Sequence, residues 1–247
     1  MTYAVSDLHG CYNSWMALLD QIQLTDEDNL YVLGDIVDRG PAPMAILQDM
    51  MGRCNVFPIA GNHDFAAFLA LKSLTTELTD ESIRKMEENK DFEQMLLWLS
   101  DGGQSTLEAF KELPQEDRQD ILDYFQEFSF YEELELENGK RYLLSHTGSD
   151  EIREGRPLEE VPVDAFLSGR LNYDRQYFSD RIWITGHTPT RMISGAEPDR
   201  IYRSSNHIAI DCGCVFGGYL GAIRLEDGRA FYVKNLDSKR EACLQSL

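Results

Sequence analysis

The stretch GDIVDRG, residues 34–40, follows directly on the apolar run LYVL at residues 30–33. Two aspartates and an arginine at the end of a buried strand are costly unless they find partners. The same arrangement recurs where YAVS at 3–6 runs into DLHG, and where NVFPIAG at 55–61 runs into NHD. Amphipathic helical patterns separate these strands. The alternation predicts parallel β-α-β units and therefore an α/β fold.

The rest of the chain changes character. Residues 65–128 are mostly helical and acidic in pattern, with a break at SDGGQS, 100–105, and we interpret them as an insertion that covers one side of the sheet. Two alternating runs flank Asn138-Gly139 and predict a hairpin over 130–146. Further strands are predicted over 181–187, 207–213, 219–225 and 230–234. The second half is therefore richer in antiparallel β-structure.

Composition excludes some classes of function. The chain has 247 residues, with 23 Lys+Arg against 43 Asp+Glu and a formal net charge of -20. Such a surface repels phosphate backbones and anionic lipids, so we expect no general nucleic-acid binding and no membrane binding. A small phosphorylated ligand remains compatible with a locally basic or metal-charged pocket. Five cysteines without framework spacing and an N-terminus without a basic n-region predict a cytoplasmic protein with reduced thiols.

Potential metal ligands stand at the ends of five predicted strands. They are Asp7 and His9, Asp35, Asn62, His146, and His187. Ligand sites in open α/β sheets lie outside the carboxyl ends of strands, so these loops can converge. Mixed oxygen and nitrogen ligands suit Mn²⁺, Fe²⁺ or Zn²⁺. A single aspartate after a strand is more often a turn residue than a metal ligand. The prediction therefore rests on the occurrence of potential ligands at all five strand ends. His207 lies inside a strand pattern and is interpreted as structural.

The order of the motifs DLHG, GDIVDRG, GNHD, SH and GH resembles the phosphoprotein-phosphatase group of the calcineurin-like metallophosphoesterases, over about residues 3–233. The stretches DLHGCY, WLSDGGQSTL at 98–107 and IDCGCVFGG at 210–218 are most similar to the short bacterial and phage members. The resemblance implies one metallophosphoesterase domain over 1–247. Its expected fold is a mixed β-sandwich flanked by helices.

The resemblance also implies a centre of two divalent metal ions, with Mn²⁺ expected and Fe²⁺ or Zn²⁺ as alternatives. Asp7 and His9 would bind the first ion, and Asp35 would bridge both. The ligands of the second would be Asn62, His146 and His187. A hydroxide held between the ions would attack phosphorus in line.

The remaining roles follow from the same resemblance. His63 would be the general acid, and Asp38 would orient it. Arg39 would grip the phosphate with its forked guanidinium, and Arg175 in NYDR would be the second phosphate-binding arginine. The nearby rivals of Arg175 are Arg170, Arg181 and Arg191.

Two cues on the substrate disagree. GNHD, in place of the GNHE common among phosphoprotein phosphatases, also occurs in relatives that cleave dinucleoside polyphosphates. Those relatives commonly lack Asp38, which this chain has. We therefore predict a serine/threonine protein phosphatase-like phosphomonoesterase acting on a phosphorylated protein or small phosphoester. The alternatives are a symmetrical bis(5'-nucleosyl)-tetraphosphate hydrolase and, less favoured, a scaffold that binds phosphorylated partners without turnover.

Overall fold

The computed structural model describes residues 1–75, 79 and 90–237. One mixed sheet has the order β10-β9-β1-β2-β3, in which β1, β2 and β3 are parallel and β9 and β10 are antiparallel additions. Its strands are β1 (Thr2–Val5), β2 (Asn29–Leu33), β3 (Val56–Ile59), β9 (Tyr219–Arg224) and β10 (Ala230–Lys234).

A second mixed sheet has the order β4-β5-β6-β8-β7, with β5, β6 and β8 parallel and an antiparallel strand at each edge. Its strands are β4 (Tyr131–Glu135), β5 (Arg141–Ser145), β6 (Ile182–Thr185), β7 (Tyr202–Ser204) and β8 (His207–Ala209). The hairpin predicted around Asn138-Gly139 is confirmed as β4 and β5. The short edge strand β7 was not predicted.

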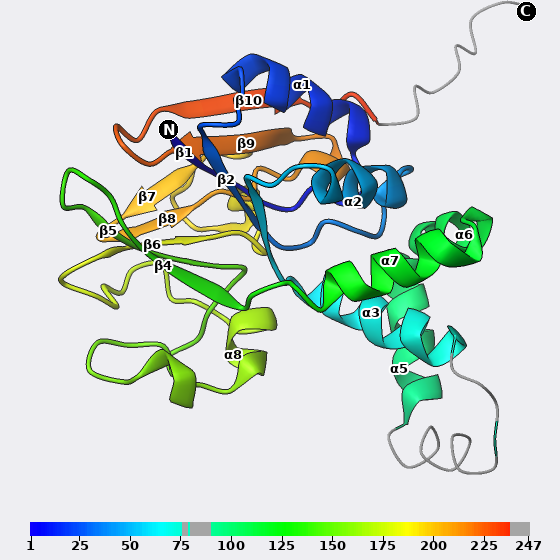
Figure 1. Cartoon of the computed structure of the whole chain (residues 1–247). Helices are drawn as coiled ribbons and strands as arrows, with labels where there is room; N and C mark the ends of the chain where they lie inside the picture. The colour runs from blue at the N-terminus through cyan, green and yellow to red at the C-terminus, as the bar shows by residue number, and fades with distance from the viewer. Residues whose placement is uncertain (76–78, 80–89, 238–247) are drawn as a thin grey trace, which may run out of the picture.

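The two sheets pack face to face. Buried aliphatic side chains from both meet between them: Ala4, Leu33 and Ile59 from the first, Leu144, Ile184 and Ile208 from the second. Helices α1 (Tyr12–Ile22) and α2 (Pro43–Met51) cover the other face of the first sheet, where Trp15 and Leu47 are fully buried. The expected mixed sandwich flanked by helices is therefore confirmed (Figure 1).

The helical region beside the sandwich starts from β3 and returns to β4 (Figure 1). It contains α3 (Asn62–Thr75), α5 (Asp91–Trp98), the π-helical turn η1 (Leu99–Gly103), α6 (Gln104–Glu112) and α7 (Gln115–Phe125). The predicted helical character of 65–128 is thus confirmed where the structure describes it. Most of the acidic stretch 75–94 lies outside the described residues.

Shorter elements complete the chain. They are α8 (Val163–Leu167) and the 3-10 turns η2 (Leu158–Glu160), η3 (Thr190–Met192) and η4 (Cys214–Phe216). Within the described ranges, no helix has the length and apolar character that crossing a membrane requires. The loops that follow β1, β2, β3, β5 and β6 leave the sheets at their carboxyl ends, where the candidate site lies.

Candidate active site

The loops after β1 and β2 are joined by their backbones. The amides of Asp7, His9 and Gly10 donate to the carbonyls of Gly34, Asp35 and Ile36, at 2.8 to 3.0 Å. The sheet pairing therefore continues beyond the strands, and it places the DLHG and GDIVDRG motifs side by side. Across the sandwich, the amide of Gly186 donates to the carbonyl of His146 at 2.9 Å, which joins the SH and GH motifs in the same way.

Many of the candidate residues adopt left-handed backbone conformations. Their φ angles are 54° at Asp7, 41° at His9, 52° at Asp35, 70° at Asp38, 67° at Arg39 and 66° at His187. Aspartate and histidine are among the few non-glycine residues that tolerate this region. Four of these turn residues, Asp7, His9, Asp35 and His187, are also candidate ligands.

Two glycines allow the loops to approach closely. A Cβ atom on Gly40 would lie 1.9 Å from the carbonyl oxygen of His9, and one on Gly61 would lie 2.2 Å from Oδ1 of Asp35. Neither contact can be relieved by a rotamer change of the new side chain, because it involves the Cβ itself. The last residue of GDIVDRG is thus fixed as glycine by the DLHG loop.

A buried carboxylate ties the second and third motifs together. Asp64 is 1% exposed and accepts hydrogen bonds from the amides of Ile36 at 2.9 Å, Val37 at 3.2 Å and Gly61 at 3.0 Å. Burial and the nearby Asp35 raise the pKa of Asp64 to about 7, while these three amides act to lower it. The aspartate of GNHD therefore binds the backbone of the loops and holds the second and third motifs at a fixed distance.

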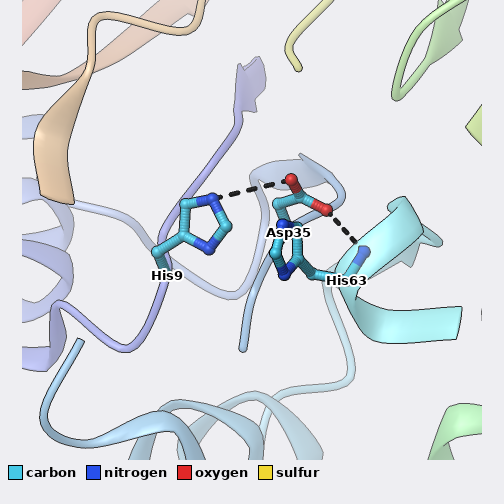
Figure 2. A group of neighbouring side chains, drawn as sticks. All are labelled: His9, Asp35 and His63. Atoms are coloured by element: carbon cyan, nitrogen blue, oxygen red, sulfur yellow. Dashed lines mark hydrogen bonds and ion pairs between the residues drawn. The ribbon is translucent and has the colours of Figure 1, made fainter. Parts of the chain in front are cut away.

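Asp35 lies between two groups of imidazoles. Its Oδ2 is 3.5 Å from Nε2 of His9, and its Oδ1 is 3.4 Å from Nε2 of His146 and accepts the amide of His63 at 3.0 Å. Figure 2 shows Asp35 between His9 and His63. Two sets of residues each have potential ligand atoms within 4.8 Å of one another. The first set is Asp35, His9 and His63, and the second is Asp35, His146 and His187. Asp35 thus belongs to both, with one oxygen facing each side.

Carbonyl groups fix the tautomers of two histidines. Nδ1 of His9 donates to the carbonyl of Val37 at 2.9 Å, and Nδ1 of His146 donates to that of Leu33 at 2.8 Å. Since a carbonyl only accepts, each Nδ1 carries the proton and each Nε2 presents a lone pair to the site. Metal-binding histidines are commonly oriented in this way.

The other candidate ligands adjoin this second group. Nε2 of His146 is 3.1 Å from Oδ1 of Asn62 and 3.0 Å from Nδ1 of His187. The amide of His187 donates to Oδ2 of Asp7 at 3.0 Å. The structure therefore brings the side chains of His9, Asp35, Asn62, His146 and His187 together. Asp7 adjoins them through the amide of His187, whereas the close set around His9 and Asp35 contains His63 in its place.

The protonation equilibria of the site favour cation binding. Burial lowers the pKa of His9 to about 3 and that of His187 to about 4, so both imidazoles are neutral and available as ligands. Burial, Asp211 and Asp35 together raise the pKa of Asp7, because three buried carboxyl groups repel one another. A divalent cation would remove this repulsion. The donor set and the excess of buried acid both fit a metal centre.

His63 is held by a network that reaches into the helical region. Its Nδ1 is 2.7 Å from Oδ2 of Asp38, which is fully buried. The same carboxylate accepts the indole N–H of Trp98 at 2.8 Å and the hydroxyl of Thr106 at 2.6 Å. Burial acts to lower the pKa of His63, but the hydrogen bond to Asp38 and the charge of Asp35 outweigh it, so this pKa is raised. His63 thus differs from the neutral histidines beside it.

Arg39 points into the same space. Its Nη1 is 2.7 Å from Nε2 of His9, and its Nη2 is 3.1 Å from Oδ1 of Asp101. The guanidinium side chain is 25% exposed, and it lies 5.4 Å from the ring of Phe216. A positive, partly open fork therefore stands beside the imidazoles.

A family model described as calcineurin-like phosphoesterase matches residues 2–217. The chain belongs to this family. The phosphoesterase is also 34% identical, over 101 residues, to the symmetrical bis(5'-nucleosyl)-tetraphosphatase of Erwinia tasmaniensis, a match that covers 40% of this chain and 36% of that protein. It is 33% identical over 100 residues to the enzyme of the same name from Salmonella typhimurium, again with 40% and 36% covered. The chain thus matches little more than a third of the length of these relatives.

Solved structures support the fold. A candidate diadenosine tetraphosphatase superposes with a TM-score of 0.65 at 16% identity, over 95% of this chain and 93% of that one. A metallophosphoesterase from Sphaerobacter thermophilus superposes with a TM-score of 0.54 at 14% identity, over 95% and 88%. At these identities the similarity concerns the fold alone.

Among the contacts that the structure describes for Arg175, the arginine of NYDR, none is with a proposed metal ligand. Nη1 of Arg175 is 2.9 Å from Oδ1 of Asp150, and its guanidinium lies 5.1 Å from the ring of Tyr177. Its rival Arg170 contributes to the lowered pKa of His187, after burial and His146.

Several functional candidates were missed from the sequence. Asp211, in IDCGC, is buried beside Asp7 and Asp35, and burial raises its pKa to about 7. Trp98 and Thr106 support Asp38, and Asp101 contacts Arg39. The signal that could identify Asp211 is an acidic residue at the end of an apolar strand pattern; Asp211 lies within the strand predicted over 207–213, whereas β8 ends at Ala209.

Proposed function

We propose that this phosphoesterase hydrolyses phosphoric ester or anhydride bonds at a site built around Asp35. The observation that carries the proposal is the position of this carboxylate, whose two oxygens face two separate groups of imidazoles. Asp7, His9, Asn62, His146 and His187 complete a set that fits two divalent ions, for which we propose Mn²⁺. The metals, when bound, supply positive charge to the phosphoryl oxygens and lower the pKa of water.

The chain's own residues supply the remaining chemistry. The planar guanidinium of Arg39, which lies against His9 and Asp101, could offer two N–H groups to two phosphoryl oxygens. His63 keeps a proton because Asp38 holds Nδ1–H at 2.7 Å, so Nε2–H of the imidazolium can protonate the leaving oxygen. Trp98 and Thr106 fix the rotamer of Asp38 and hence the direction of this donation.

For the substrate, we propose a symmetrical dinucleoside tetraphosphate. The support is the name shared by the curated relatives at 33% and 34% identity. The GNHD cue adds little, since Asp64 contacts loop amides and not the open part of the site.

A phosphorylated serine or threonine is the second candidate, and the His63–Asp38 pair favours it. An alkoxide is a poorer leaving group than a nucleoside diphosphate, so its departure depends more on a proton donor. A buried carboxylate that maintains the imidazolium is the device such a reaction needs.

The test measures turnover with Mn²⁺ on three substrates: diadenosine tetraphosphate, a phosphoserine peptide and p-nitrophenyl phosphate. We expect chromatography to show two ADP molecules per diadenosine tetraphosphate, with a kcat/KM above that for the peptide. ATP and AMP as products would contradict symmetrical cleavage. A higher kcat/KM for the peptide would favour the phosphatase.

Asp35→Asn is the variant that tests the site. It should abolish Mn²⁺-stimulated hydrolysis of all three substrates, because an NH₂ group, which cannot bind a cation, replaces one of the two oxygens that would hold the ions. Asp227→Asn, at a turn of the first sheet and paired with Arg224, removes the same charge and should leave turnover unchanged. Activity of Asp35→Asn close to that of wild type would refute the two-metal proposal.

A further inference from the structure

An acidic residue reaches the site from the helical region. Asp101 lies in η1, between α5 and α6, where the helix is broken: Asp101 has φ -98° and ψ 17°, and Gly102 has φ 108°. The side chain of Asp101 is 63% exposed. Its carboxylate therefore stands at the open side of the site, and the break in the helix turns it toward the loops of the sandwich.

This carboxylate contacts two groups already assigned to the substrate. Oδ1 is 3.1 Å from Nη2 of Arg39, and Oδ2 is 3.5 Å from Nε2 of His63. Arg39 is the proposed partner of a phosphoryl oxygen, and Nε2 of His63 is the proposed proton donor to the leaving oxygen. A phosphoryl group that binds both side chains therefore competes with Asp101 for the same N–H groups.

The backbone of Asp101 is fixed, whereas its side chain is not enclosed. The amide of Arg39 donates to the carbonyl of Gly102 at 3.0 Å, and a Cβ on Gly102 would lie 2.6 Å from Cγ of Arg39. The turn is therefore packed directly against the arginine. Because the carboxylate is exposed, it can leave Arg39 and His63 by rotation of its own side chain, without movement of the turn.

We propose that Asp101 acts as an internal anion, whose carboxylate competes with a phosphoryl group for Arg39 and His63 and must be displaced when that group binds. Its two oxygens contact Arg39 and His63 at the same time. When phosphate is present, the like charge weakens the binding of that phosphate and speeds its release. The inference rests on the proposed roles of Arg39 and His63, and it holds for either proposed substrate.

The test is the binding of inorganic phosphate, measured by titration calorimetry with Mn²⁺ at constant ionic strength. We expect Asp101→Asn and Asp101→Ala to bind phosphate about tenfold more tightly than wild type, because a like charge a few ångströms from the anion is removed. The matched control is Asp120→Asn, which removes the same charge from an exposed aspartate of α7. It should bind phosphate as wild type does.

Kinetics provide a second readout. With p-nitrophenyl phosphate, Asp101→Asn should lower both KM and the inhibition constant of phosphate by about the same factor, without a rise in kcat. Unchanged or weaker phosphate binding in both Asp101 variants would overturn the inference. Weaker binding would show instead that Asp101 only positions Arg39. Failure to cleave diadenosine tetraphosphate would refute the proposed substrate and leave this result unaffected.

Discussion

Replacing Asp64 by alanine tests how the site is held together. In the folded protein its carboxylate accepts the amides of Ile36, Val37 and Gly61, all in loops where the chain is buried. The alanine variant leaves three buried N–H donors without a partner, and each unsatisfied donor lowers the free energy of unfolding by about 1–3 kcal/mol. Removal of the repulsion between Asp64 and Asp35 acts in the opposite direction. We therefore expect a loss of about 3 kcal/mol, at the low end of the sum.

The measurement is the free energy of unfolding from urea titration, supported by thermal unfolding. For a chain of this size, about 3 kcal/mol lowers Tm by about 10 °C. Asp64→Asn should lose less, about 1 kcal/mol, because the amide oxygen still accepts from Ile36 and Val37 while its NH₂ group opposes Gly61. Asp120→Ala, at an exposed position, is the control and should change stability little.

The result that would refute this reasoning is a loss below about 1 kcal/mol for Asp64→Ala. It would mean that water or another group satisfies the three amides. A loss of metal affinity without a loss of stability would also contradict it, since the two loops would then be held together by other contacts.

Three further predictions concern separate features. Gly40→Ala should lower the free energy of unfolding by about 2 kcal/mol or more and weaken Mn²⁺ binding, because the new Cβ meets the carbonyl oxygen of His9. Urea unfolding and titration calorimetry measure the two effects, and unchanged values would contradict the close approach of Gly40 to His9. His63→Asn should reduce hydrolysis of a phosphoserine peptide more than that of p-nitrophenyl phosphate, since a nitrophenolate leaves with little protonation; equal losses would count against the general acid. Burial lowers the pKa of His207 to about 4, so the unfolded chain takes up the proton first as pH falls from about 6.5, and the folded protein loses up to about 3 kcal/mol by pH 4. His207→Gln should remove that part of the pH dependence, and identical slopes for the two proteins would refute it.

Much of the fold follows from local patterns. The strands predicted at 3–6, 30–34 and 55–61 agree with β1, β2 and β3 to within one or two residues, because apolar runs between turn residues have few alternatives. The β7 edge strand was missed, since Tyr202–Ser204 is short and alternates with polar residues. The partition of the strands into two sheets depends on long-range packing and entered only through family resemblance.

The candidate ligands could be proposed from the sequence because each follows a predicted strand, and strand ends converge by topology. The supports of the site were not found. Trp98 and Thr106 lie in helices, where a tryptophan and a threonine look like ordinary packing residues; their hydrogen bonds to Asp38 span 60 and 68 residues of sequence. Nor can sequence patterns show that Asp101 faces Arg39, because the kink at Gly102 directs it.

The left-handed turns at Asp7, His9, Asp35 and His187 limit how this site can vary. β-branched residues such as valine and threonine are strongly disfavoured at such φ angles, whereas asparagine, aspartate, histidine and glycine are accepted. Substitutions that preserve the loops are thus drawn from a short set that is itself made largely of metal ligands. Variants of this site can exchange one oxygen or nitrogen donor for another, and so alter metal preference, more readily than they can lose the turns that present those donors.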